Sequence, residues 1–137
     1  MAWAVLDSSV YLGHWERGDF AEELELVEQT FIVRHSSVVL SELRRGARTR
    51  LAQRRIDELY RLARAQWDPT AQDWWEAGKL IRVIGDAQGW DTRKRLAFQN
   101  DALIALTARR YGAIIVTANQ ADFALFGRAV GVLVLSV

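Results

Sequence analysis

The stretch that decides the fold lies at residues 4–12 and reads Ala4-Val5-Leu6-Asp7-Ser8-Ser9-Val10-Tyr11-Leu12. An apolar run stops at an acid, two small hydroxyl residues follow, and apolar residues then resume. This pattern predicts a short buried strand that turns directly into a helix. Because ligands of open parallel sheets bind at the carboxyl ends of the strands, we expect Asp7 to lie at that edge.

The composition bounds the class of protein before any motif is considered. The chain has 137 residues, of which 50% are apolar and 26% are charged, and it has no cysteine. This length favours one domain, residues 1–137, with a sizeable core. The lack of cysteine excludes disulfides and thiolate metal sites. No apolar run reaches the length of a membrane span, about 20 residues, and the start lacks signal-peptide features, so we expect a cytoplasmic protein.

Charge is distributed unevenly along the chain, although the formal net charge is only +1. Residues 16–28 are strongly acidic, whereas residues 43–66 are rich in arginine. The asymmetry predicts one acidic face and one basic face.

Strand patterns and helix patterns alternate along the chain. Strands are predicted at 4–6, 31–34, 113–117 and 130–137, and helices at 8–16, 19–31, 36–43, 50–66, 70–84 and 101–111, with a loop at 85–95 and a turn or short helix at 120–126. The run 113–117 is β-branched without polar interruption, which is typical of a strand buried on both faces. We therefore predict an α/β fold in which helices flank a mostly parallel central sheet, an α/β/α sandwich.

Candidate capping residues precede several of the predicted helices. Asp19 suits the start of the second helix, and Ser36 or Ser37 that of the third. Thr70 with Asp73 forms a capping-box pattern after the only proline. The stretch 99–101 is expected to cap the apolar helix that follows it.

Acids and amides recur at places that would meet at one edge of the sheet. Each has a structural alternative: a helix cap for Asp7, a solvated helix face for Glu42, and compensation of the helix dipole for Asp101. Asn119 and Asp122 follow the strand 113–117, where turns also favour such residues. Clustered carboxylates raise one another's pKa unless a cation compensates them. The natural cation for an oxygen-only cluster is Mg²⁺, with Mn²⁺ as the other choice.

Four ordered motifs resemble those of PIN domains, and most closely those of the VapC toxins of bacterial toxin–antitoxin pairs. The likeness covers essentially the whole chain, and its motifs read Leu6-Asp7-Ser8-Ser9-Val10, Ser37-Val38-Val39-Leu40-Ser41-Glu42-Leu43-Arg44-Arg45-Gly46, Asn100-Asp101-Ala102-Leu103-Ile104-Ala105 and Val116-Thr117-Ala118-Asn119-Gln120-Ala121-Asp122-Phe123. The resemblance implies a Mg²⁺-dependent endoribonuclease that leaves 5′-phosphate and 3′-hydroxyl ends, the toxin of a type II toxin–antitoxin system.

The same resemblance assigns roles to individual residues. It implies metal binding by Asp7 and Asp101, with Glu42 completing the acidic site. Ser9 and Thr117 match hydroxyl positions that orient the acids.

The fourth acidic position of the family falls on Asn119, which is an amide here. Whether the site takes one metal ion or two therefore stays open. Asp122 either supplies the fourth carboxylate or stabilises the turn. An alternative function follows from the same amide, namely a catalytically weak PIN-like module that binds RNA or protein.

We expect two kinds of partner, an RNA substrate and a protein. Arg44, Arg45 and Arg48 are candidates for holding the RNA backbone, because guanidinium groups bind phosphate bidentately. Their alternative is a solvated helix face. The resemblance also implies a small VapB-like antitoxin, a homodimer, and a heterotetramer or larger assembly with the antitoxin.

Other kinds of chemistry lack support in the sequence. His14 and His35 have no partner at metal-ligand spacing, and neither a Gly-rich phosphate loop nor a G-x-S-x-G nucleophile motif is present. Trp74 and Trp75 are adjacent, so one helix cannot bury both. The exposed one suits an interface or, more rarely, base stacking.

Overall fold

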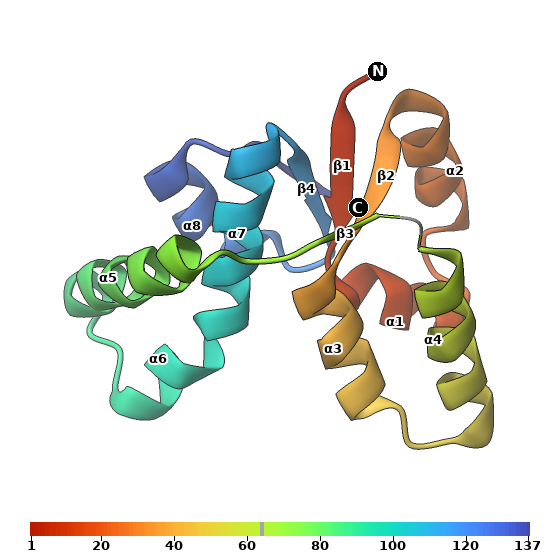
Figure 1. Cartoon of the computed structure of the whole chain (residues 1–137), viewed down its shortest axis with the longest axis horizontal. Helices are drawn as coiled ribbons and strands as arrows, with labels where there is room; N and C mark the ends of the chain where they lie inside the picture. Colours follow the sequence, from red (N-terminus) through yellow and green to blue (C-terminus); the bar gives the residue numbers. More distant parts are fainter. Residues whose placement is uncertain (64) are drawn as a thin grey trace.

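The structure, a computed structural model, describes residues 1–63 and 65–137. Helices lie on both sides of a parallel sheet (Figure 1). Along the chain the elements are β1 (Trp3–Leu6), α1 (Ser8–Arg17), α2 (Ala21–Thr30), β2 (Ile32–Ser36), α3 (Ser37–Gly46), α4 (Arg50–Leu62), β3 (Gln66–Trp67), α5 (Ala71–Gln88), α6 (Thr92–Ala97), α7 (Gln99–Tyr111), β4 (Ile114–Thr117), α8 (Gln120–Val130) and β5 (Val134–Ser136).

The strand order places a switch point between the first strand and the fourth. The sheet runs β3-β2-β1-β4-β5, and every pairing is parallel. The chain builds outward from β1 on one side and then returns to build outward from β4 on the other. In such a sheet the crevice beyond the carboxyl ends of the two central strands is the usual ligand site. Here those ends are Leu6, paired with Val116, and the residues that follow them.

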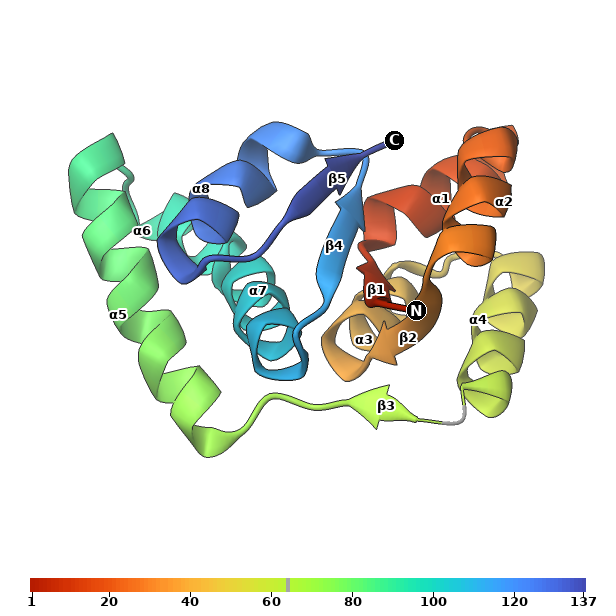
Figure 2. The same cartoon turned by 90° about the horizontal axis from the view of Figure 1, so that it is seen from above.

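Alternation along the two central strands sends side chains into two separate cores. Val5 and Ile115 belong to the larger core with α3, α5, α7 and α8. Ala4, Leu6 and Val116 belong to the smaller core, which includes Val10 of α1 and Val27 of α2. Figure 2 shows the strands between α5–α8 on one side and α1, α2 and α4 on the other. Residues two apart on a strand face the same side of the sheet, so each side has its own core and its own helices. The predicted α/β/α sandwich is confirmed.

Local signals placed several helix boundaries correctly. Ser36 Oγ accepts hydrogen bonds from the amides of Val38 and Val39 at the start of α3. Thr70 and Asp73 form the predicted reciprocal capping box at the start of α5. These caps act within four residues of themselves, which is why the sequence alone reveals them.

Three of the predicted starts and ends were wrong. Asp19 does not cap α2; Phe20 occupies the N-cap position with φ 65°, and Asp19 accepts a 2.7 Å hydrogen bond from Arg17 Nε. The stretch 99–101 is not a cap either, because α7 already begins at Gln99 after Phe98. The final strand is shorter than 130–137, since α8 continues to Val130 before β5 begins.

Two further predictions were wrong between residues 50 and 97. The segment 85–95 is not a loop: α5 continues to Gln88, and Asp91 caps the short helix α6 by accepting from the amide of Lys94 at 2.8 Å. The predicted helix 50–66 ends at Leu62 as α4, and its residue Arg64 lies outside the described residues. Gln66 and Trp67 form the edge strand β3, which two residues are too short to reveal by periodicity.

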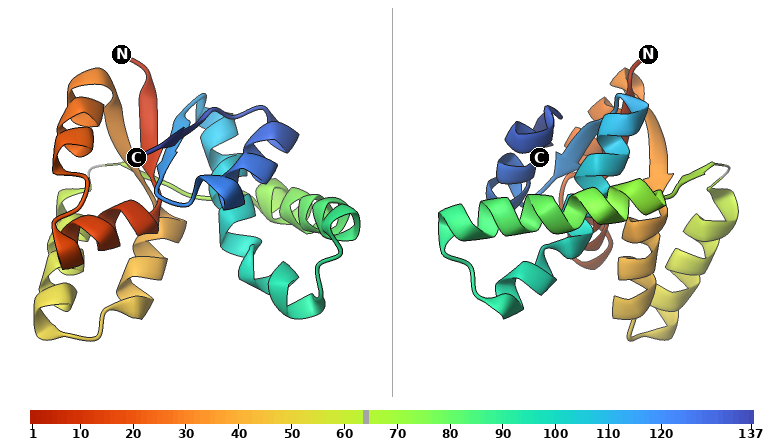
Figure 3. Two further views of the ribbon diagram at one scale, coloured as in Figure 1. Left: turned by 180° about the vertical axis from the view of Figure 1, so that it is seen from behind. Right: turned by 60° about the vertical axis from the view of Figure 1, so that its left-hand side comes forward.

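The helices of the larger core also differ in how they meet the sheet. Both views of Figure 3 show α5 outside α7, so that α7 lies between α5 and the strands. Every residue of α7 from Ala102 to Ala108 is buried accordingly. None of the described helices has the length and apolar character needed to cross a membrane.

Candidate active site

The Asp7 carboxylate is held by two hydroxyl groups at the switch point of the sheet. Ser9 Oγ donates to Asp7 Oδ2 at 2.7 Å, and Thr117 Oγ1 donates to the same oxygen at 3.0 Å. Asp7 is only 4% exposed and Thr117 is fully buried. Among the described residues, Oδ1 has one contact, a long 3.5 Å approach from Ser8 Oγ. One oxygen of Asp7 is therefore anchored, and the other keeps most of its capacity to accept.

The hydroxyl groups that hold Asp7 are themselves positioned by the backbone after β4. Ser9 Oγ accepts from the amide of Ala118 at 3.1 Å, and Thr117 Oγ1 accepts from the amide of Asn119 at 2.9 Å. Asp7 occupies the N-cap position of α1, yet its side chain makes no capping hydrogen bond. The carboxylate is thus held by hydroxyl groups at the edge of the sheet and does not cap the helix, which argues against the purely structural interpretation.

Asp101 joins Asp7 from the first turn of α7. Burial, the largest cause, acts together with the negative charges of Asp7, Glu42 and Asp122 to raise the pKa of Asp101 from 3.8 to about 8. Desolvation and nearby like charges both disfavour the ionised form of a carboxyl group. The four acids come from α1, α3, α7 and α8 or their starts, so only the folded chain brings them together.

Glu42 of α3 is a further member of the acid cluster and is half-buried. Burial and the charge of Asp7 raise the pKa of Glu42, whereas hydrogen bonding with Asn100 and the charge of Arg45 lower it. Among the described residues, Glu42 Oε1 is buried without a hydrogen-bond partner. An orphaned buried oxygen is costly unless a cation, a water or a ligand satisfies it.

Asn119 and Asp122 lie at the exposed rim of the same edge. Asn119 precedes α8 and its side chain makes no capping hydrogen bond. Asn119 contributes to the site through its backbone amide, which donates a hydrogen bond to Thr117 Oγ1 and so helps to position that hydroxyl. Asp122 is exposed in the first turn of α8, and its charge reaches Asp101.

The acid cluster suits Mg²⁺ better than a metal with many direct protein ligands. In residues 1–63 and 65–137, no three His, Cys, Asp or Glu side chains lie close enough together to hold one metal ion directly. Mg²⁺ usually keeps several waters and binds through one or two carboxylates. An all-oxygen group with excess negative charge and the orphaned Glu42 Oε1 fits that mode of binding.

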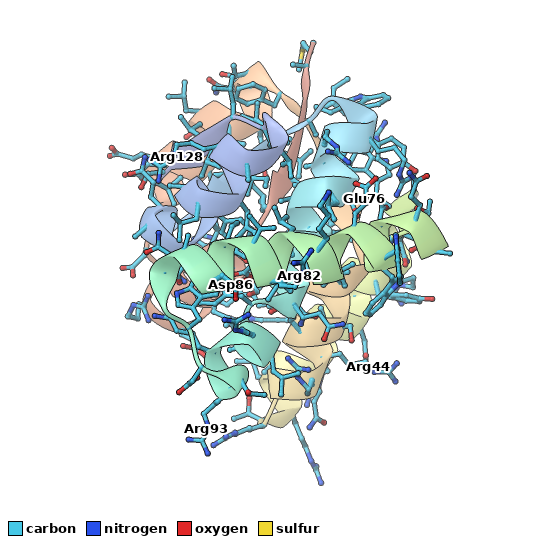
Figure 4. All side chains as sticks on the ribbon, turned by 90° about the vertical axis from the view of Figure 1, so that its left-hand side faces the viewer. Arg44, Glu76, Arg82, Asp86, Arg93 and Arg128 are labelled. Atoms are coloured by element: carbon cyan, nitrogen blue, oxygen red, sulfur yellow. The ribbon has the colours of Figure 1, made fainter. Side chains whose placement is uncertain are left out.

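The three candidate arginines, two in α3 and one just after it, lie in different surroundings. Arg45 is the one whose charge acts on Glu42. Arg44 lines a hollow of about 460 Å³ between α3 and α4, and Figure 4 shows it extending from the ribbon. Arg48 lines a second hollow of about 500 Å³ that α1, α3 and α4 enclose.

Asn100 is a site residue that sequence reasoning missed. Its amide interacts with the Glu42 carboxylate and also lines a hollow beside α3. The available signal is its place directly before Asp101 at a helix start, where the sequence predicts a capping role. With Phe98 in the N-cap position, the side chain of Asn100 is free for the acid cluster.

Comparisons with known proteins agree with this geometry. A model of the PIN domain family matches residues 4–128. A comparison with curated protein sequences finds no match.

Three solved structures illustrate the likeness of the fold. The VapBC-1 structure from nontypeable Haemophilus influenzae has a TM-score of 0.72 and 21% identity, covering 98% of this chain and 97% of that one. The promoter-bound VapBC2 of Rickettsia felis has a TM-score of 0.69 and 22% identity, covering 98% of both chains. The DNA-bound VapBC of Salmonella typhimurium has a TM-score of 0.68 and 21% identity, covering 99% of this chain and 98% of that one.

The family match spans nearly the whole chain, from β1 into the last turn of α8, and includes every acid of the cluster. The chain belongs to the PIN domain family.

Proposed function

We propose that this protein is a Mg²⁺-dependent endoribonuclease and the toxin of a type II toxin–antitoxin pair. The observation that carries the proposal is the grouping of Asp7, Glu42, Asp101 and Asp122 at one edge of the sheet, where burial and the charges of the other three acids raise the pKa of Asp101 to about 8. Such a concentration of uncompensated acids destabilises the protein unless a cation is bound. Membership of the PIN domain family supports a nuclease in general, and the acid cluster supports metal dependence.

The environment of each residue in the cluster suggests its role in the reaction. Asp7 and Asp101 would hold Mg²⁺, which when bound polarises a phosphodiester and lowers the pKa of a bound water. Ser9 and Thr117 keep Asp7 in one orientation through the hydrogen bonds at 2.7 and 3.0 Å. Glu42, with its raised pKa and free Oε1, is suited to accept a proton from the attacking water.

The RNA backbone would be held by cations beside the acids. Arg45 is the candidate whose charge acts on Glu42. A phosphodiester that approaches the cluster needs such a cation to offset the repulsion from the carboxylates. Arg44 and Arg48 would contact the RNA farther from the cleavage point.

A small antitoxin is the proposed protein partner. The solved VapBC relatives support this partner through their shared fold. The apolar hollow of about 500 Å³ is the groove that a peptide of the antitoxin would fill, and it is lined by Leu12, Trp15, Leu43, Leu51 and Ile56 with Arg48 and Arg55. A homodimer in the cytoplasm, and a heterotetramer or larger assembly with the antitoxin, complete the proposal.

Cleavage of RNA by the purified protein tests the enzymatic part. With Mg²⁺ the wild type should cut RNA internally, and EDTA or Asp7→Asn should abolish the cleavage. Glu58→Gln, an exposed acid on α4 outside the cluster, is the matched control and should cut normally. Equal activity of the wild type and Asp7→Asn would contradict the proposal. Growth arrest on expression that Asp101→Ala relieves tests the toxin role separately.

A second candidate is a PIN-like module that binds RNA or protein without cutting efficiently. Two observations favour it: Asn119 is an amide, and among the described residues no three acids are close enough to hold one ion directly. The cleavage assay separates the two candidates, because this module would bind RNA equally well with Mg²⁺ or EDTA and leave it intact.

A further inference from the structure

Trp74 stands where three shallow hollows of the surface meet. The first hollow, of about 230 Å³, is also lined by Arg45 and Asn100, the neighbours of Glu42. The second, of about 280 Å³, extends past Gln99 toward α6, and the third, of about 380 Å³, extends past Lys79 and Arg82 along α5. All three hollows share Trp74, and together they reach from Arg45 and Asn100, beside Glu42, out over α5; we call these three hollows the path.

Two exposed indole rings line this path, and the space above the helix backbone at Gly78 is open. Trp74 is 51% exposed and Trp75 is 84% exposed, an unusual amount of indole surface in contact with water. Gly78 lies between Trp74 and Arg82 on the helix, and a Cβ added there would meet no atom within 4 Å. A flat ring system can therefore lie against the tryptophans without displacing a side chain of α5.

Ion pairing leaves this part of α5 with unneutralised positive charge. The three acids of the helix each have an arginine partner from another segment: Asp73 has Arg110, Glu76 has Arg109, and Asp86 has Arg95. In the part of the chain that the structure describes, neither Lys79 nor Arg82 has a carboxylate within salt-bridge distance. Figure 4 shows Arg82 on the outer side of α5, with Arg93 on α6 below it.

We propose that this path binds the single-stranded RNA that flanks the scissile phosphate. A base stacks on Trp74, Arg45 and Asn100 contact the nucleotide next to the acid cluster, and Lys79 and Arg82 bind the phosphates farther along. The combination of aromatic surface with a cationic backbone track is the usual means of holding single strands. The inference rests on the proposed function for the identity of its ligand and adds to it the residues that bind the flanking nucleotides.

Charge favours RNA over a second copy of this chain as the occupant. A two-fold contact over α5 would bring the unpaired Lys79 and Arg82 of each copy near one another. The neighbouring acids of α5, Glu76 and Asp86, are already paired with Arg109 and Arg95 within the chain. An RNA strand supplies the missing negative charge at every nucleotide.

Binding of a fluorescein-labelled oligouridylate 12-mer to the full-length protein in EDTA tests the path without cleavage. Stacking on an aromatic residue typically contributes enough that Trp74→Ala should weaken binding about 5- to 150-fold, whereas Trp74→Phe should retain most of it. The oligonucleotide should also quench tryptophan fluorescence in the wild type, and Trp74→Phe should lose part of this quenching.

The cationic end of the path has its own readout. Each phosphate contact contributes about 0.7 to the slope of log affinity against log salt for a single strand, so Arg82→Ala should lower the slope by about that amount. Arg128→Ala on α8 is the matched control; Arg128 is exposed and carries the same charge, but it lines none of the three hollows. The control should leave the slope unchanged.

The outcomes separate this inference from the proposed function. If the wild type cleaves RNA with Mg²⁺ while Trp74→Ala and Arg82→Ala bind and cleave like it, the path is wrong and the endoribonuclease stands. If the wild type binds the 12-mer through Trp74 but never cleaves, the path stands and the endoribonuclease fails. If Trp74→Ala instead converts a dimer into a monomer in sedimentation and leaves RNA affinity unchanged, a second copy occupies the hollows and the inference is overturned.

Discussion

The Thr117 hydroxyl donates a 3.0 Å hydrogen bond to Asp7 Oδ2, which joins the end of β4 to the end of β1 across the switch point of the sheet. The two residues are 110 positions apart in the chain, and both side chains are buried. The same hydroxyl accepts from the amide of Asn119. One side chain thus connects the last strand before α8 with the acid on which the site depends.

Thr117→Val tests this connection, because valine keeps the shape of threonine and removes the hydroxyl. Loss of the group that orients a metal-binding carboxylate typically lowers affinity or activity about 10- to 100-fold. We expect a fall of that size in RNA cleavage, with a loss of about 1–2 kcal/mol in the free energy of unfolding.

Thr107→Val is the matched control for that substitution. Thr107 is equally buried, but its hydroxyl donates within α7, to the carbonyl of Leu103 at 2.7 Å. This variant should lose a similar amount of stability and keep normal cleavage. Equal loss of cleavage in both variants would assign the effect to general destabilisation.

The raised pKa of Asp101 predicts an unusual dependence of stability on pH. Burial and neighbouring acids raise it from 3.8 to about 8, so between these pH values the folded state binds more protons than the unfolded state. Stability is fully present below pH 3.8 and is lost as the pH rises through 8. In EDTA the free energy of unfolding should fall by up to about 1.4 kcal/mol per pH unit from this group.

Urea unfolding of the wild type and Asp101→Asn at pH 5, 6.5 and 8 measures this contribution. The stability gain of Asp101→Asn over the wild type should grow with pH, because the amide cannot ionise. Glu58→Gln on α4 should run parallel to the wild type. Parallel curves for Asp101→Asn would mean that Asp101 ionises as readily in the folded chain as in the unfolded one.

Mg²⁺ should reverse the penalty that the acids impose. A ligand at 100 times its dissociation constant stabilises the folded state by about 2.7 kcal/mol. At pH 7.5 we expect MgCl₂ to raise the melting temperature of the wild type, and Asp101→Asn to lose most of this increase.

Glu42→Gln refines the same experiment at a neighbouring position. Burial and the charge of Asp7 disfavour the charged form of Glu42, so the amide should stabilise the metal-free protein. The variant should respond less to MgCl₂ than the wild type. An unchanged response of both variants would place the metal elsewhere.

Close packing against β5 leaves no room for a side chain at Gly127 of α8. A Cβ at Gly127 in α8 would lie 2.7 Å from Val134 Cγ2 and 2.9 Å from the carbonyl oxygen of Val132. Because the backbone cannot yield as a side chain can, Gly127→Ala should lose about 1–3 kcal/mol of stability in urea unfolding. Gly78→Ala on α5, where the space is open, should gain about 0.5–1 kcal/mol. A neutral Gly127→Ala would show that α8 and β5 can separate at little cost.

Patterns confined to a few residues were predictable from the sequence. The strand ending at Asp7, the β-branched strand before Asn119, the Ser36 cap and the capping box at Thr70 follow from interactions within about four residues. The edge strand at Gln66 and Trp67 was not predictable in this way, because its pairing with β2 and the burial of Trp67 depend on residues far along the chain. The helix α6 was not predicted, because the mixed charges and Gly89 of this segment favour a loop and Asp91 was not recognised as a helix cap.

The sequence by itself determined which residues could form a metal-binding cluster, since acids and hydroxyls follow the predicted strands and open the predicted helices. Only the tertiary structure decided how they share the work. Parallel pairing of β1 with β4 brought Thr117 to Asp7, and packing of α3 and α7 brought Glu42 and Asn100 together. Burial then shifted the pKa of Asp101. Local interactions along the chain specify strands and helix starts, whereas strand order and burial depend on the whole core, which no short stretch contains.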